Sequence, residues 1–431
     1  MSPLRGRSFR RLWVAGLISD TGDWLLLVSL PILVYQYTHS TLGTATAFLV
    51  ELAPPVLLAP LAGRVADRVD GRRTLMWISV AQAVAVTPLL LVHGRAGLPL
   101  LYVVVFAQAA LASVFDPTKS AMLPTLVDPD RLLPANSLVA LNQNVGRLIG
   151  GSLGGALLAV GGGLSVIVIA DGVSFLLAAT LIAGVAQPRT SDPGVASRSE
   201  IHAQPTRPAR LPSTPSARPV PPGGPVKAEW AATLRPRPVR AGLLVLLTAS
   251  VAQGIFVVLF IVFVARVLHG GSAEIGLLRG VQAVGAIVAG LALVAARRVG
   301  AAALTAWASV VFGLLDLAVW NLPHLTLAAP VYVGLFAAVG APGTALVTGL
   351  TSAMQQAAPD GRRGKVFAAM GVASSVGQAA GMIIAGVLGD AVGVVGILNA
   401  QGVLYLLAGA VAARWLGRLP RPGIQTEPAH C

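Results

Sequence analysis

The chain is poor in cysteine and in charged residues. Its single cysteine, Cys431, is the last residue, which excludes an internal disulfide and a metal site built from cysteines. Charged residues make up only 11% of the 431 positions, against about a quarter in soluble domains, while 55% are hydrophobic. A chain of this composition buries most of its length in lipid, so we expect a membrane protein.

Sequence signatures of catalysis and of ATP binding are also lacking. The chain has no Gly-x-x-x-x-Gly-Lys-Ser/Thr phosphate loop, no nucleophile elbow and no His-Glu-x-x-His motif. We therefore expect no enzyme activity, no cofactor and no metal. The histidines are scattered among predicted loops and tails, at His39, His93, His202, His269, His324 and His430.

Twelve apolar segments are long enough to cross a bilayer, which takes about 20 residues. No small-residue cleavage site follows the first of them, so we expect a retained helix and not a signal peptide. The predicted fold is an all-α polytopic membrane protein with two pseudo-symmetric six-helix bundles. The spans are expected near residues 12–35, 42–62, 74–92, 98–115, 136–160 and 164–185, and then near 241–265, 274–294, 301–320, 325–345, 366–388 and 392–415.

The break between the two sets of spans is rich in proline. Residues 186–240 hold twelve of the thirty prolines and almost no large apolar side chains, which is typical of a flexible, solvated linker. A regulatory or partner-binding segment is the alternative. The expected organisation is a first bundle over residues 1–185, the linker over 186–240, a second bundle over 241–418 and a tail over 419–431.

The net charge of +14 follows from the placement of the basic residues. Of the 31 lysines and arginines, 27 fall in the terminal segments, the linker and loops that share one side if the spans alternate. The positive-inside rule then predicts that both termini and the linker lie in the cytoplasm, with the spans in the plasma membrane. Because topology accounts for the charge, we expect no nucleic acid as a partner.

The two halves resemble each other at a shift of about 230 residues. The segment Val127-Asp-Pro-Asp130 before span 5 is echoed by Ala357-Ala-Pro-Asp360 before span 11, and Val145-Gly146 by Val376-Gly377. In transporters, such repeats place the substrate site near the middle of the membrane, between the halves.

The loop between spans 2 and 3 combines glycines with acidic and basic residues, at Gly63, Asp67, Arg68, Gly71, Arg72 and Arg73. This loop resembles the signature loop of the major facilitator superfamily. The resemblance implies a conformational latch that holds the two halves in the outward-facing state, with Asp116 as a partner for Arg72. A plain positive-inside anchor is the alternative. The equivalent loop of the second half has Arg297 and Arg298 but no aspartate, so we expect a one-sided latch.

Span 5 carries Asn144-Val-Gly146-Arg147 followed by four more glycines, and it resembles the antiporter motif of exporters in that superfamily. Small residues at these spacings let helices approach closely, and ordinary helix packing is the alternative interpretation. The family pattern has proline where this chain has Gly151. The motif glycines are Gly146, Gly150, Gly151, Gly154 and Gly155.

Residues of the first span narrow the resemblance from the superfamily to one of its subgroups. Phe9-Arg-Arg-Leu-Trp13 and Ser19-Asp-Thr-Gly-Asp-Trp24 resemble the subgroup that contains the enterobactin exporter and the macrolide-efflux proteins.

Ionisable residues in the middle of the predicted spans are functional candidates, because charge in the bilayer is costly. Asp20 and Asp23 share one helix face, and Arg147 and Glu51 are expected at a similar depth. We interpret Asp23 first, then Asp20 and Glu51, as proton-coupling or cation-recognising groups, with Arg147 as their tuning partner and Asn144 beside it. A static structural ion pair is the alternative.

The second half has no matching acids. At the repeat shift, Asp20 and Asp23 correspond to Ser250 and Gln253, and Arg147 corresponds to Gln378. Energy coupling is therefore expected in the first half. Three further ionisable residues are expected near the outer ends of their helices, in structural or gating roles: Asp171, Arg279 and Asp316.

These observations favour a secondary active transporter, namely a proton-coupled exporter of an amphipathic small molecule such as a drug, macrolide or siderophore. The expected partners are that substrate, protons and membrane lipids, and the protein is expected to be a monomer. Two alternatives stay open: a lysophospholipid or metabolite facilitator of the same fold, and a non-transporting membrane receptor or scaffold.

Overall fold

The computed structural model describes residues 3–68, 70–128, 131–160, 163–186, 226–295, 299–359 and 361–416. Within these residues the chain forms twelve long α-helices and one short α-helix, α8 (Val226–Leu234), besides short 3-10 turns. The long helices of the first half are α1 (Arg7–Thr38), α2 (Thr41–Arg68), α3 (Gly71–Val86), α4 (Leu98–Leu126), α5 (Leu132–Leu158) and α6 (Gly163–Ala183). Those of the second half are α9 (Arg237–Arg266), α10 (Ser272–Ala295), α11 (Ala301–Asn321), α12 (Ala329–Ala357), α13 (Arg363–Val392) and α14 (Val394–Trp415).

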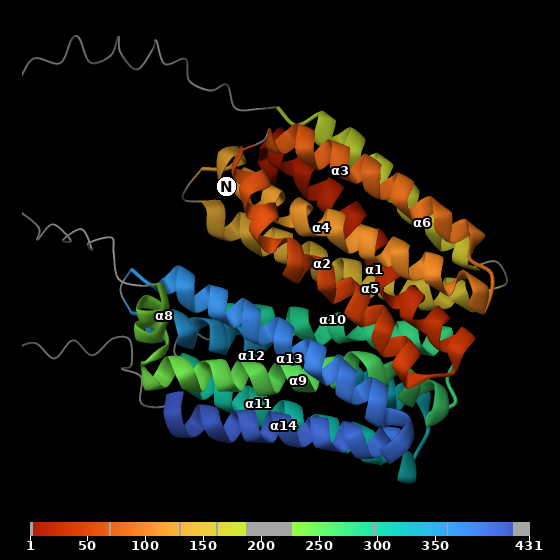
Figure 1. The fold of residues 1–431 in the computed structure, drawn as a ribbon, viewed down its shortest axis with the longest axis vertical. Helices are drawn as coiled ribbons and strands as arrows, with labels where there is room; N and C mark the ends of the chain where they lie inside the picture. Colours follow the sequence, from red (N-terminus) through yellow and green to blue (C-terminus); the bar gives the residue numbers. More distant parts are fainter. Residues whose placement is uncertain are drawn as a thin grey trace, which may run out of the picture.

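Eleven of the described helices are long and apolar enough to cross a membrane. The twelfth long helix, α5, has polar side chains near its middle, among them Asn142, Asn144 and Arg147. The helices form two bundles, the first drawn from red to yellow and the second from green to blue (Figure 1). The predicted all-α, polytopic, two-bundle fold is confirmed.

Several helices extend beyond their predicted apolar segments. α4 continues to Leu126, through Pro117 and Pro124, although its apolar run was expected to end near residue 115. Two polar residues in its last turns, Thr118 and Lys119, are buried against the bundle, at 1% and 8% exposed. The second half is helical from α8 onward, before the expected boundary at 241. The rest of the expected linker (187–225) and the tail lie outside the described residues.

Glycines on α5 bring the two halves together. A Cβ on Gly155 would lie 2.6 Å from the Cα of Gly276 on α10, so neither position has room for a side chain. The equivalent crossing is between α13 and α2. A Cβ on Gly386 of α13 would lie 2.7 Å from the Cβ of Ala45 on α2. These two crossings are related by the internal repeat, and they hold the halves in contact through small residues.

At one end of the molecule, polar side chains fasten the halves to each other. Asp390 of α13 accepts hydrogen bonds from the backbone N–H and the hydroxyl of Thr41, at 3.2 and 2.8 Å. Its other oxygen accepts from the Arg266 guanidinium at 2.6 Å. Arg266 also donates to the Tyr35 hydroxyl at 2.8 Å and to the His39 carbonyl at 2.7 Å. We call this set of five residues the polar lock, and its end of the molecule the closed end.

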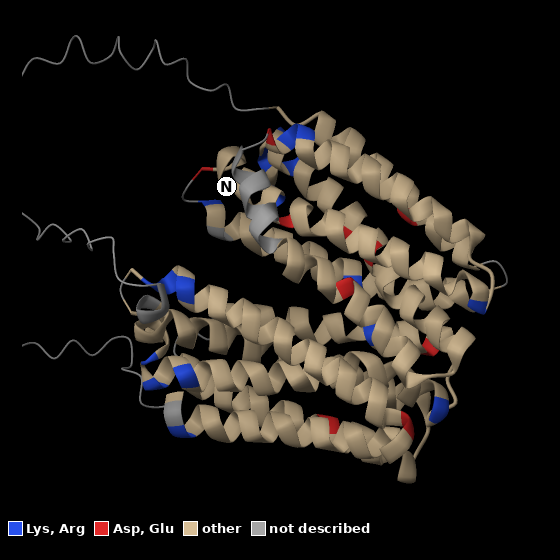
Figure 2. Ribbon diagram, viewed as in Figure 1, with Lys and Arg blue, Asp and Glu red and all other residues tan. Residues whose placement is uncertain are grey.

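The bundles diverge away from the closed end, toward the end that carries the N-terminus and α8 (Figure 1). In the described part of the chain, the hydrogen bonds that join the two halves all lie at the closed end. Lysines and arginines gather mainly at the diverging end, while a few acidic residues lie midway along the helices (Figure 2). The structure is therefore closed on one side only.

Candidate functional site

A central cavity of about 290 Å³ lies between the two halves. Residues of α1, α2, α9, α10 and α13 line it, so both bundles contribute. Most of its wall is apolar, with Phe48 and Phe260 among the larger side chains. The polar lining residues are Glu51, Gln253, Arg279 and Gln378.

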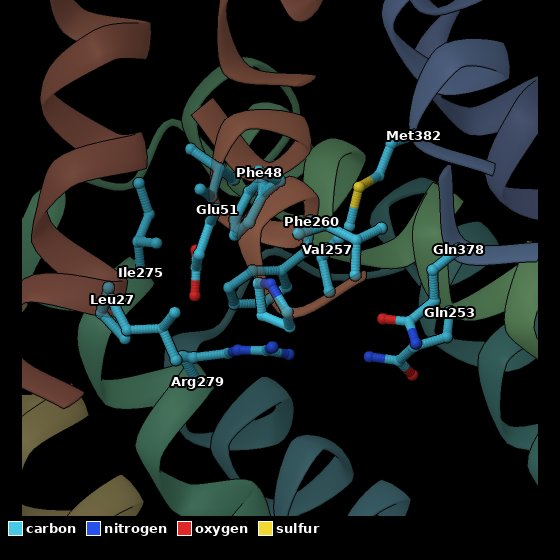
Figure 3. Close-up of a pocket in the computed structure, with 14 residues that line it drawn as sticks. Leu27, Phe48, Glu51, Gln253, Val257, Phe260, Ile275, Arg279, Gln378 and Met382 are labelled. Atoms are coloured by element: carbon cyan, nitrogen blue, oxygen red, sulfur yellow. The ribbon is translucent and has the colours of Figure 1, made fainter. Parts of the chain in front are cut away.

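Glu51 and Arg279 enter the central cavity from opposite halves. Glu51 comes from α2 and Arg279 from α10, and the guanidinium lies below the carboxylate, near enough for electrostatic attraction (Figure 3). The Arg279 guanidinium also lies 5.2 Å from the centre of the Phe256 ring. This arrangement offers a ligand one negative and one positive group on facing walls. Arg279 was expected near the outer end of its helix, in a structural or gating role, yet it lines the cavity.

Gln253 and Gln378 face each other on the wall contributed by α9 and α13 (Figure 3). They occupy the positions that correspond, through the repeat, to Asp23 and Arg147 in the first half. Gln378 donates a hydrogen bond of 3.2 Å to the Ser374 hydroxyl. The second half thus presents neutral amides where the first half has charged groups.

A larger cavity of about 610 Å³ lies within the first half, and we call it the N-half cavity. Its lining residues all lie between Asp23 and Pro117, on α1 to α4. It shares Leu27, Glu51 and Pro55 with the central cavity. Asp23 lines it from near the middle of α1, where the carboxylate faces the cavity and not the helix packing.

The acidic residue Asp20 has a different partner from the one expected. Lys119 of α4 lies 3.8 Å from its carboxylate and 3.5 Å from that of Asp116. Arg147, expected to pair with an acid in this layer, instead places its guanidinium 4.8 Å from the centre of the Trp24 ring. Its Nε has no hydrogen-bond partner among the described residues. The difference arises because α4 extends far enough to bring Lys119 into the bundle.

Asn144, grouped with these charges in the sequence, donates a hydrogen bond of 3.1 Å to the Ala140 carbonyl of its own helix. It therefore satisfies its amide locally. In the described residues, no group of three or more histidine, cysteine, aspartate or glutamate side chains could hold a metal ion.

The expected latch residues are partly described. Gly71 is the first residue of α3, and Arg73 lies 3.6 Å from Asp70, which caps that helix. Arg72 donates hydrogen bonds of 3.4 and 3.3 Å to the carbonyls of Ala183 and Val185. In this conformation Asp116 pairs with Lys119, so the expected contact between Arg72 and Asp116 is not formed. The side chains of the other three latch residues lie outside the described part of the chain: Gly63, Asp67 and Arg68.

The glycines of the α5 motif form two stripes with different partners. Gly146, Gly150 and Gly154 face α1, where a Cβ on Gly146 would lie 2.9 Å from the Asp20 carbonyl carbon. Gly151 and Gly155 face α10 of the other half. One stripe therefore seats the acidic helix α1, and the other stripe forms the contact between the halves.

Several residues of the site were not identified as such from the sequence, among them Lys119, Gln253 and Gln378, and Arg279 was given another role. Lys119 seemed to belong to a loop because the apolar run of α4 ends before it. Gln253 and Gln378 are neutral, and only their repeat positions could have pointed to them. Arg279 could have been found by comparing its depth in α10 with that of Glu51 in α2.

Two helical bundles are related by a repeat and are closed at one end over a mostly apolar cavity that carries a few polar side chains midway along the helices. This arrangement defines a membrane transporter. The family model described as Major Facilitator Superfamily matches residues 12–327, which is most of the chain. The chain belongs to this superfamily, and it is a multi-pass membrane protein. Its family and fold are those of a transporter.

Curated relatives match over part of their length. An uncharacterized MFS-type transporter of Bacillus subtilis is 32% identical over 166 residues, which is 38% of this chain and 39% of the relative. The staphyloferrin A transporter of Staphylococcus aureus is 29% identical, over 32% of this chain and 36% of that protein. The multidrug efflux pump Tap of Mycolicibacterium fortuitum is 27% identical, over 37% and 40%. The chain thus spans about two fifths of the length of these relatives.

Among solved structures, a bacterial homologue of the iron transporter ferroportin in its inward-facing state superposes with a TM-score of 0.67 at 19% identity. The match covers 97% of this chain and all of that one. This likeness extends the shared fold through the rest of the second half, beyond residue 327 where the family match ends.

Proposed function

We propose that this protein is a secondary active exporter that moves an amphipathic small molecule out of the cell in exchange for protons. The carrying observation is the mid-helix cavity between two bundles that are fastened at one end and diverge at the other. In such a fold, rocking of the halves exposes one site to each side of the membrane in turn.

The orientation we propose follows from charge. Lysines and arginines gather at the diverging end (Figure 2), and the positive-inside rule assigns such an end to the cytoplasm. Both termini then lie in the cytoplasm of a cell whose plasma membrane holds the protein. In this orientation the polar lock closes the outer side, and the structure is open inward.

Asp23 is the group we propose for proton exchange. It lies near the middle of α1, faces a cavity and has no ion pair with any described residue. Asp20 is less suited, because Lys119 neutralises it. Glu51 lies opposite Arg279 and is the second candidate. The Arg147 guanidinium, which lies 4.8 Å from the centre of the Trp24 ring, modulates the charge of these carboxylates.

Export, and not import, is favoured by two independent similarities. The α5 sequence resembles an antiporter motif, and the curated relatives include a multidrug efflux pump and a siderophore transporter.

The test is efflux of a fluorescent cationic dye and of a macrolide from cells that express the native chain, Asp23→Asn or Arg147→Ala. Glu274→Gln is a matched control, because Glu274 is an exposed carboxylate outside both cavities. We expect native cells to retain less dye, a protonophore to abolish the difference, and Asp23→Asn to behave as the empty vector at equal surface expression.

Other outcomes would select the alternatives. If the protonophore does not change efflux, and if both variants show the same efflux as the native chain, the protein is a facilitator that works without protons. No change in accumulation for any probe, with the protein at the cell surface, would favour a receptor or scaffold.

A further inference from the structure

The N-half cavity differs in charge from the central cavity. Its ionisable lining residues are all acidic, namely Asp23, Glu51 and Asp116. The central cavity, by contrast, sets Arg279 against Glu51. A ligand in the N-half cavity therefore meets carboxylates and no lining cation.

Two of these carboxylates are compensated and one is not. Asp116 lies 3.5 Å from Lys119, and Glu51 faces Arg279 across the central cavity. Asp23 has no ion pair with any described residue, and its side chain is exposed to the cavity. One negative charge on the cavity wall, near the middle of α1, is thus left for a ligand to neutralise.

A second observation, independent of charge, also indicates a ligand. Gln82 of α3 lines the same cavity, is only 4% exposed and has a carboxamide without a hydrogen-bond partner among the described residues. Its neighbour Gln108 donates to the Gln82 carbonyl at 3.0 Å, while the Gln108 Oε1 is buried and unpartnered. Buried amides normally find partners, so the Gln82 carboxamide offers hydrogen bonds to a bound molecule. The Gln108 Oε1 is sealed from the cavity and does not face such a molecule.

The rest of the wall suits an apolar body. Trp24, Leu26, Leu30 and Val105 line it, and polar atoms make up a small part of the surface. The volume of about 610 Å³ lies within the range of small-molecule pockets.

We infer that the N-half cavity binds an organic cation with an apolar body, held by the Asp23 carboxylate and by the Gln82 amide. This inference rests on the proposed transport function and narrows its substrate to amphipathic cations. Glu51, which lines both cavities, lies where such a molecule passes from the N-half cavity to the central cavity.

The test is equilibrium binding to the purified full-length protein in detergent, with empty micelles as the blank. Tetraphenylphosphonium and tetraphenylborate are probes of nearly equal size and opposite charge. We expect the native protein to prefer the cation, and Asp23→Asn to weaken cation binding by about tenfold. Gln82→Leu weakens it by a smaller factor, and Glu274→Gln leaves it unchanged.

Equal affinity for the two probes, or native affinity in Asp23→Asn, overturns the inference. Each variant should also have the same melting temperature as the native protein. A loss of binding is then not caused by a loss of fold. The assay needs no gradient, so it separates the two proposals. If the protein prefers the cation but does not transport it in vesicles, the binding site is supported and the exporter is refuted. If it transports the cation but binds both probes equally well, the exporter is supported and the binding site is refuted.

Discussion

Lys119 joins a buried carboxylate, Asp20, to an exposed one, Asp116, in the first half. Its side chain is 11% exposed and lies between the carboxylates of Asp20, 13% exposed, and Asp116. Replacing Lys119 with methionine keeps most of the length of the side chain but leaves Asp20 buried without a cation. Since an uncompensated buried charge is costly, we expect Lys119→Met to lower the free energy of unfolding by about 3 kcal/mol.

Denaturant unfolding in detergent measures this loss. The double variant Asp20→Asn with Lys119→Met removes both charges and is expected to regain most of the stability. A Lys119→Met protein as stable as the native one would show that the pair contributes nothing.

Two other buried aspartates differ in their partners. Asp171 is fully buried, and neither carboxylate oxygen has a hydrogen-bond partner among the described residues. In Asp316, by contrast, one oxygen accepts from the Gln401 amide at 2.6 Å. Asn fits each site, so we expect Asp171→Asn to keep or raise stability and Asp316→Asn to lower it by about 1 kcal/mol. A larger loss in Asp171→Asn, measured by the same unfolding assay, would mean that its carboxylate has a role the contacts do not explain.

Individual residues were predictable to different degrees. A charged side chain in an apolar run stands out in any sequence, which is why Asp20, Asp23, Glu51 and Arg147 could be singled out. Their pairings could not be, since a pairing depends on which helix faces come together. Lys119 shows this, because only the packing of α4 against α1 brings it to Asp20.

At the scale of elements, the crossing of α5 and α10 depends on the absence of side chains. A Cβ on Gly276 would lie 2.7 Å from the Gly151 carbonyl oxygen and from the Gly155 Cα, all of which are backbone atoms. We expect Gly276→Ala to force the halves apart, to lower the free energy of unfolding by about 2 kcal/mol and to abolish efflux.

Gly290 on the same helix provides a matched control, because a Cβ there meets nothing within 4 Å. Gly290→Ala should leave efflux unchanged and, through helix propensity, keep or raise stability. If both variants transport equally well, the close crossing is not needed for function.

The existence of each long helix was predictable, since apolar runs of this length have few alternatives in a membrane protein. The ends of the helices were harder to predict. An apolar run marks the part of a helix that faces lipid, and the backbone hydrogen bonds of the helix can continue beyond it. The extension of α4 past Pro117 and the early start of α9 at Arg237 are examples.

At the scale of the whole molecule, the polar lock selects one conformation. Asp390 alone accepts three hydrogen bonds, two from Thr41 of the other half and one from Arg266. We expect Asp390→Ala to shift the equilibrium toward opening at the closed end, by about tenfold in the ratio of the two states.

Electron spin resonance distances between labels at Gln36 and Ala391, both exposed near the closed end, can measure this shift in a Cys431→Ser background. Asp128→Ala is the control, because Asp128 pairs with Arg131 at 3.4 Å inside one half. A label distance that lengthens equally in both variants, or in neither, would show that the lock does not select the conformation.

The two-bundle organisation was visible in the sequence through the repeat of about 230 residues. The conformation was not visible in the sequence, because the same sequence adopts every state of a transporter. We expect the free-energy difference between these states to depend on a few contacts such as the polar lock. The cavities were equally hidden, because their walls combine residues from up to five helices.

The central claim is that export of an amphipathic molecule is coupled to protons through Asp23. The direct measurement uses proteoliposomes with a trapped pH indicator and an imposed pH gradient, to which tetraphenylphosphonium is added. The account predicts a proton flux that depends on the cation in the native protein and is absent in Asp23→Asn. Movement of the cation at the same rate with and without the gradient, and with no proton flux, would contradict it.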